Sequence, residues 1–243
     1  MGSVPEGIDH IGLAVPDLES GIEDVHRRTG VRPTLLPPER GQWYRRATLC
    51  IGQGCTLEVI APNAAHHLFH PMKTILRQLQ GPFLLFWSMA TDDMQTAQSR
   101  IRACGGRLSR IHTAGSGSDL QHPHYDFIAI GPGFETLRPC LINWHHRGAH
   151  RPRQADCQFY GLELSDPDPA RFHDLFGSLD IGLTVRQGPS AVKLTLQTPK
   201  GMVSFQNPSW QFTLPGLIGS MLCDLLDTVA DAGASRQFPL DRL

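Results

Sequence analysis

The chain has 243 residues, with 22 basic and 23 acidic side chains and a formal net charge of −1. This balance gives no electrostatic reason to expect nucleic acid or an anionic membrane as a partner. No apolar run approaches the roughly 20 residues that cross a bilayer, and no secretory leader is recognisable. We therefore expect a soluble, cytoplasmic protein that binds a small molecule and not a membrane or nucleic acid.

The first predicted unit spans residues 1–62 and has the element order βαβββ. An apolar strand over residues 8–15 ends at Pro16, and Asp17 can cap a helix over residues 18–29 that stops at Gly30. Short strands are predicted near Thr34 and over residues 44–51 and 57–61.

The second predicted unit, over residues 82–146, repeats this order after a connector over residues 63–81 that is partly helical. Its first strand covers residues 83–90, and Asp93 caps a helix that ends near Cys104. The remaining strands are predicted over residues 107–112, 125–130 and 139–144.

A third, partial unit is predicted over residues 156–206, followed by a C-terminal helical tail over residues 207–243. Its helix begins at the Asp-Pro-Asp-Pro segment of residues 166–169 and reaches Leu179. The repeated pattern predicts an α+β fold of mixed, mainly antiparallel sheets with helices outside.

The first unit carries two residues that could bind a metal ion together. His10 lies on its first strand and Glu58 on its last, and both side chains could point the same way. An imidazole and a carboxylate on one sheet face are two ligands of the kind that divalent metals bind. Because Glu58 stands among apolar neighbours, its carboxylate must either face solvent or find a partner. The alternative for His10 is a structural histidine bonded to the backbone.

Other histidines cluster in segments that follow the two units: His66, His67 and His70, and then His145, His146 and His150. Adjacent histidines on a strand point to opposite faces, so at most one of each neighbouring pair could serve a common ion. We interpret them as surface-loop residues, with His145 or His146 as a candidate substrate contact. His122 and His124 belong to a flexible connection or a lid.

Four short segments carry a resemblance to a known family. They read IDHIGLAVPDL at residues 8–18, LEVIAP at 57–62, ATDDM at 90–94 and PCLINW at 139–144. The chain resembles the vicinal oxygen chelate superfamily, in its glyoxalase-like branch. This resemblance implies two units whose curved sheets close around a cleft, and a divalent metal held by the first and last strands of each unit. The metal would chelate adjacent oxygens of a small metabolite in an isomerase, lyase, hydrolase or dioxygenase reaction.

The resemblance assigns His10 and Glu58 to the ligand positions of the first unit. In the second unit Phe86 precedes Asp93 by seven residues, as His10 precedes Asp17, and Asn143 is assigned to the last strand. Three alternatives follow. A metal of unknown identity could sit on His10, Glu58 and Asn143 with open positions, or another histidine could replace the missing one. Otherwise the cleft is metal-free, with His10 as a base and Glu58 as its orienting partner.

A binding or sequestering protein is the second function that the sequence allows. Replacement of a ligand by Phe86 would give the cleft an apolar wall, to which Trp87 and Trp144 would contribute a stacking surface. Asn143 and His145 complete the predicted substrate contacts. The cleft can be completed within one chain, and both a monomer and a homodimer are compatible with the sequence.

Overall fold

The computed structural model describes residues 7–37, 42–52, 54–68, 70–114, 125–131, 136–145 and 155–207. The predicted helical tail beyond residue 207 and the histidines at 122, 124, 146 and 150 lie outside these ranges. The helices are α1 (Leu18–Thr29), α2 (Pro71–Arg77), α3 (Met94–Ala103), the 3-10 helix η2 (Pro169–Phe172) and α4 (His173–Ser178).

The strands of the first sheet are β1 (Ile8–Ala14), β2 (Thr34–Leu35), β3 (Tyr44–Cys50), β4 (Thr56–Pro62), β5 (Phe83–Ala90), β6 (His112–Ala114), β7 (Tyr125–Ala129) and β8 (Cys140–Trp144). The strands of the second sheet are β9 (Gln158–Asp166), β10 (Val185–Gln187), β11 (Ala191–Thr198) and β12 (Gly201–Gln206).

Side-chain caps fix where the two main helices begin. The Asp17 carboxylate accepts from the Ser20 backbone N–H at 2.9 Å, and the Asp93 carboxylate accepts from that of Thr96 at the same distance. Helix α1 ends at Gly30, which adopts the left-handed conformation with φ 82°. The predicted helix over residues 18–29 is therefore confirmed residue for residue.

The first sheet has eight strands in the order β2-β3-β4-β1-β5-β8-β7-β6. Strand β1 is parallel to β4 and antiparallel to β5, and β5 is in turn parallel to β8. Each unit thus contributes four strands, and the two units join along β1 and β5. The predicted α+β fold of curved, mixed sheets is confirmed.

The second sheet has the order β10-β9-β11-β12. In the first unit the opening strand β1 lies beside the last strand β4, whereas β9 lies between β10 and β11. The turn after β10 returns to β9, where the Gly188 N–H donates to the Asp166 carbonyl at 3.1 Å. The predicted third unit thus has the expected chain order but a different strand arrangement from the first two.

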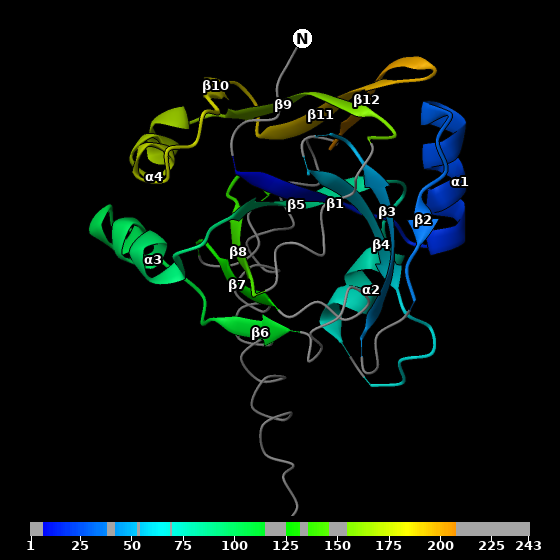
Figure 1. Cartoon of the computed structure of the whole chain (residues 1–243), viewed down its shortest axis with the longest axis horizontal. Coiled ribbons are helices and arrows are strands. Elements are labelled where there is room, and N and C mark those ends of the chain that lie inside the picture. Colours follow the sequence, from blue (N-terminus) through cyan, green and yellow to red (C-terminus); the bar gives the residue numbers. More distant parts are fainter. Residues whose placement is uncertain are drawn as a thin grey trace, which may run out of the picture.

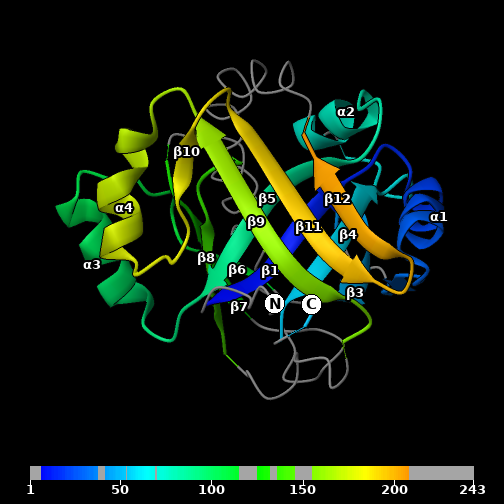
Figure 2. The same ribbon diagram turned by 90° about the horizontal axis from the view of Figure 1, so that it is seen from above.

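The second sheet stacks on one face of the first, while α3 and α4 lie side by side at one end and α1 at the other (Figure 1, Figure 2). The core fills the space between the sheets, with Leu57 and Leu194 wholly buried. We call the opposite face of the eight-stranded sheet the concave face (Figure 1). Among the described residues, no helix is long and apolar enough to cross a bilayer.

Candidate functional site

A bulge in β1 brings two neighbouring residues to the concave face. Ile8 pairs with Met89 and His10 pairs with Ser88, so Asp9 is an extra residue in β1 relative to β5. Ile8 and Ile11 on either side are buried, whereas Asp9 and His10 are half-buried. The Asp9 carboxylate therefore lies next to the imidazole, with Oδ2 at 2.9 Å from His10 Nδ1.

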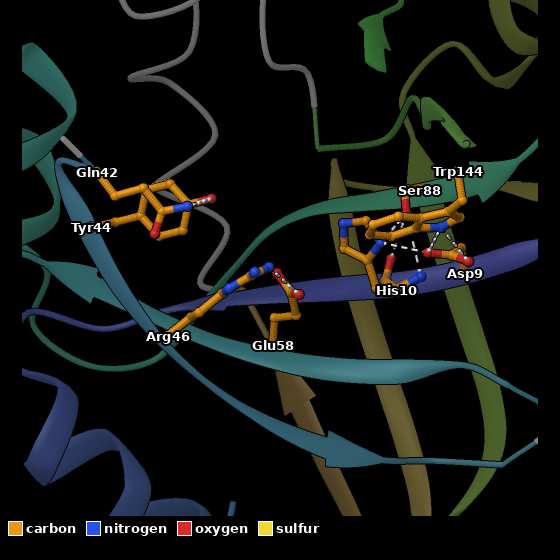
Figure 3. Close-up of polar contacts among 8 residues, drawn as sticks. All are labelled: Asp9, His10, Gln42, Tyr44, Arg46, Glu58, Ser88 and Trp144. Atoms are coloured by element: carbon orange, nitrogen blue, oxygen red, sulfur yellow. Dashed lines mark hydrogen bonds and ion pairs between the residues drawn. The ribbon is translucent and has the colours of Figure 1, made fainter. Parts of the chain in front are cut away.

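The Asp9 carboxylate is fixed from the other side by β8. Trp144 Nε1–H donates to both carboxylate oxygens, each at 3.1 Å (Figure 3). Ser88 Oγ lies 2.7 Å from His10 Nδ1, and its hydroxyl can donate to the His10 carbonyl at 3.3 Å. Because an ionised Asp9 can only accept, Nδ1 carries the proton and Nε2 of the neutral ring carries the lone pair.

The Nε2 edge of the His10 ring is available to a ligand. In Figure 3 this edge turns away from Asp9, and no described group bonds to Nε2. The ring is also held by Phe86, which packs against it edge to face with ring centroids 5.4 Å apart. A histidine with one nitrogen fixed by a carboxylate and the other unpaired has the geometry of a general base.

Charged neighbours raise the pKa of His10. Burial is the largest single influence and lowers this pKa, as does the more distant charge of Arg46. The negative charge of Glu58 and the hydrogen bond and charge of Asp9 act in the opposite direction and together outweigh them. The pKa of His10 is therefore raised above its ordinary value of 6.5.

Glu58 emerges on the same face as His10, because its register partner on β1 is Gly12, two residues beyond His10. Its carboxylate has a partner that the sequence did not reveal. Arg46 Nη1 donates to Glu58 Oε1 at 3.2 Å, with the two side chains 11% and 12% exposed (Figure 3). The predicted need of Glu58 for a partner is thus met by Arg46 on the neighbouring strand.

A local two-fold relationship between the units locates the matching positions of the second unit. On the paired strands β1 and β5, His10 lies opposite Ser88 and Gly12 lies opposite Phe86. A two-fold rotation that exchanges the two strands therefore places Phe86 at the position of His10 and Ser88 at the position of Gly12. Glu58 lies opposite Gly12 on β4, and Cys140 lies opposite Ser88 on β8. Cys140, and not Asn143, therefore occupies the position equivalent to Glu58.

The position of Asn143 differs from the predicted ligand set, in which its amide oxygen shares a metal ion with His10 and Glu58. Leu141 belongs to the core between the sheets, and residues two apart on a strand share a face, so Asn143 lies on the side away from His10. Trp144 lies on the concave face, where it reaches Asp9. The prediction chose the wrong residue of β8 because, in the described ranges, the element after β8 is the strand β9 and not a helix. The strands β1 and β5 are each followed by a helix with a capping aspartate, from which the ligand position can be counted back.

Two predicted substrate contacts also lie away from His10. Trp87 is 1% exposed and packs in the core against Phe176, with ring centroids 6.1 Å apart. His145 follows Asn143 and Trp144 and pairs with Asp126, its Nε2 lying 3.0 Å from Oδ2. Asp126 is the register partner of Asn143. The structure brings together His10, Glu58, Phe86 and Trp144, but not Trp87, Asn143 and His145.

Aromatic side chains follow the concave face across the second unit. Tyr125 and Trp144 are register partners whose ring centroids lie 4.9 Å apart, and Phe127 stacks on His112 at 5.0 Å. We call Phe86, His112, Tyr125, Phe127 and Trp144 the aromatic wall. The alternation of Tyr125 and Phe127 within one strand is a signal that sequence analysis could have used.

The described residues do not fit the predicted metal centre. His10 and Glu58 supply two donors, but Phe86 has none, and the Glu58 carboxylate already pairs with the Arg46 guanidinium. In the described part of the chain, no three His, Cys, Asp or Glu side chains are arranged to hold an ion. A cation beside Arg46 would also meet its positive charge.

Three solved structures are similar to parts of this chain, and the first of them shares its fold. A hypothetical protein from Staphylococcus aureus superposes with a TM-score of 0.54 at 8% identity, covering 84% of this chain and 85% of that one. Methylmalonyl-CoA epimerase from Mycobacterium tuberculosis gives a TM-score of 0.41 at 24% identity, covering 59% and 90%. A variant of the Streptomyces coelicolor epimerase, in complex with 2-nitronate-propionyl-CoA, gives 0.42 at 19%, covering 58% and 98%. No curated protein matches the chain in sequence.

The family model for the glyoxalase-like domain matches residues 8–179. The match begins with β1 and continues through both units of the eight-stranded sheet to the end of α4. The chain therefore belongs to the glyoxalase-like domain family, within the superfamily that its sequence resembles.

Proposed function

We propose that this protein is an enzyme that transfers a proton on a small oxygenated metabolite bound at the concave face, with His10 as the general base. The supporting observation is the series Trp144, Asp9, His10, in which the indole N–H fixes the carboxylate and the carboxylate fixes Nδ1. This arrangement sets the tautomer and the orientation of the ring, and it leaves the basic Nε2 for a substrate.

The reaction requires a base and a group that stabilises negative charge. His10 Nε2 takes a proton from a substrate C–H next to a carbonyl. The electron pair of that bond forms a C=C bond, and the π pair of the carbonyl moves to its oxygen to give an enolate. Asp9 stabilises the imidazolium that forms, and after exchange of its Nε2 proton with solvent the imidazolium returns a proton to the same carbon. Arg46, on the same face as His10, would stabilise the negative oxygen electrostatically, although its pairing with Glu58 moderates this effect.

The two halves of the concave face differ in character, which narrows the class of ligand. The first unit presents Arg46, Glu58 and His10, whereas the second presents the aromatic wall. A ligand with an oxygen-bearing end and an apolar body would match both halves.

The aromatic wall also supports a second candidate function, a protein that binds such a ligand without converting it. The two functions share the ligand class and differ only in whether His10 moves a proton. Proton exchange therefore distinguishes them.

Deuterium incorporation tests the proposal. Small 2-oxo and 2-hydroxy carboxylates are screened by thermal shift, and each compound that binds is incubated with the protein in deuterated water and followed by proton NMR. We expect exchange at the carbon next to the carbonyl, reduced about 100-fold or more in His10→Gln. His173→Gln is the matched control, because His173 also contacts the next residue, Asp174, but on an exposed surface. Binding without exchange would favour the second candidate.

The predicted divalent metal is tested with the same assay. Protein purified without a metal-binding tag is analysed for bound ions, and exchange is measured with and without a chelator. Our proposal expects exchange to survive chelation. Loss of exchange that one equivalent of a divalent ion restores, in the wild type and not in Glu58→Gln, would support the metal-dependent enzyme instead.

A further inference from the structure

Helix α2 contains a buried lysine for which the described part of the chain supplies no acidic partner. Lys73 is 7% exposed, and its ammonium donates to the His66 backbone carbonyl. Within the described ranges no carboxylate pairs with it. Removing an ammonium from water is costly unless a negative group compensates, so this position calls for an anion.

Two imidazoles beside Lys73 have unused polar atoms. His70 is 4% exposed and stacks on Trp43, with ring centroids 4.2 Å apart and an angle of 9° between the planes. Nδ1 of His70 and Nδ1 of His66 are both buried, and no group in the described ranges forms a hydrogen bond with either atom. The interpretation of His70 as a surface-loop histidine is therefore wrong, because its ring lies under the loop against Trp43.

The three side chains lie close enough to influence one another. Burial is the largest influence on the pKa of His70, and together with electrostatic repulsion from His66 and Lys73 it lowers this pKa to about 4. At neutral pH His70 is thus an uncharged imidazole whose Nδ1 can carry a proton and donate it. The group that would satisfy all three residues must accept several hydrogen bonds and bring negative charge, since a metal ion would be repelled by the Lys73 ammonium.

The backbone around these residues is held in place. The Asn63 side chain donates to the Gln42 carbonyl at 2.9 Å and accepts from the Ala65 N–H at 3.0 Å. Helix α2 lies beside β4 (Figure 1) and packs Met72 against Ala14, at the end of β1 on the concave face.

We propose that His66, His70 and Lys73 form an oxyanion-binding site for a phosphate or carboxylate group. The Lys73 ammonium supplies the charge, and the two Nδ1 atoms supply directed donors. This site is distinct from His10, Asp9 and Arg46, and it does not depend on the reaction proposed for them.

Thermal unfolding in anion titrations tests the site. The full-length protein is unfolded in inorganic phosphate, in acetate and in sodium chloride at equal ionic strength and neutral pH. We expect phosphate or acetate to raise Tm by about 3 °C near saturation relative to chloride, and the more effective of the two identifies the preferred oxyanion. The rise should disappear in Lys73→Met. Lys200→Met is the matched control, since Lys200 also donates to a backbone carbonyl, that of Arg27, but on the exposed surface.

A second variant and a second measurement separate binding from folding. His70→Phe keeps a ring to stack on Trp43 and removes the donor, so it should fold and bind the anion several-fold more weakly. In the wild type, the NMR titration midpoint of His70 should move up from about 4 when phosphate is added, because a bound anion favours the imidazolium. Equal stabilisation of Lys73→Met and wild type, or no response of the wild type to either anion, would overturn the site.

Discussion

Asp9 and His10 follow one another in the chain, yet the bulge in β1 turns both side chains to the concave face and places Asp9 Oδ2 2.9 Å from His10 Nδ1. In a regular strand these neighbours would point to opposite faces of the sheet. The bulge thus creates a carboxylate–imidazole pair from two consecutive residues. Trp144, from the last strand of the second unit, completes the arrangement, so both units contribute to orienting one histidine.

Replacing Asp9 by Asn should lower the pKa of His10, because the replacement removes a negative charge and weakens the hydrogen bond that favours the imidazolium. As the base acts in its neutral form, the rise of kcat with pH should move to lower pH, and kcat at the plateau should fall about 10-fold to 100-fold. NMR titration of the histidine ring protons measures the first effect independently of activity. Asp174→Asn, beside the exposed His173, should change neither quantity.

The sequence predicts some positions of the candidate site and not others. Capping aspartates fix the start of α1 and α3, so counting back from them correctly matched Phe86 to His10. Asp9 was not predicted as a partner of His10, because the alternation of side chains along a regular strand assigns it to the opposite face of the sheet. The bulge that overrides this alternation leaves no mark in the sequence. Cys140 was missed because no cap fixes the register of β8.

Arg46 and Ser88 illustrate a different limit. Each is a polar residue on a strand and is unremarkable until pairing is known. The register places Ser88 opposite His10, and the fold brings the Arg46 guanidinium to Glu58. Long-range strand pairing thus decides which polar residues belong to the site, and periodicity within one strand cannot supply it.

Phe86 and Cys140 occupy positions in the second unit equivalent to those of His10 and Glu58 in the first, and this equivalence predicts a gain of function. The double variant Phe86→His, Cys140→Glu would add an imidazole and a carboxylate to His10 and Glu58 on the concave face. We expect it to bind one divalent ion such as Co²⁺ per chain, measured by calorimetry and by the visible absorption of the bound ion. In the matched control Phe86→His, Asn143→Glu, the new carboxylate lies on the far side of the sheet. Equal affinity in both variants would contradict the register argument.

The ion pair of Arg46 and Glu58 should behave as a buried pair. Arg46→Met leaves the Glu58 carboxylate without its cation in a position only 12% exposed, which should lower the free energy of unfolding by about 3 kcal/mol. The double variant Arg46→Met, Glu58→Met removes both charges and should recover part of that loss. Urea unfolding of the wild type, both single variants and the double variant gives the coupling energy. Strict additivity would show that the two side chains do not interact.

Asp166 should make stability depend on acid pH. Burial is the largest single influence on the Asp166 carboxyl and raises its pKa. The Asp168 N–H, the Arg171 guanidinium and the Ser190 hydroxyl act against burial, because each donates a hydrogen bond to the carboxylate. Together they hold the pKa of Asp166 below its ordinary value of 3.8. A depressed pKa in the folded state means that the stabilisation is complete well above pH 3.8 and is lost as the pH falls through the folded-state pKa. Asp166→Asn should therefore cost about 2 kcal/mol at pH 7, and this difference from the wild type should shrink below about pH 4. Denaturant unfolding from about pH 7 to about pH 3 measures it, and a difference that stays constant over that range would show that the carboxylate charge is not what holds the loop after β9.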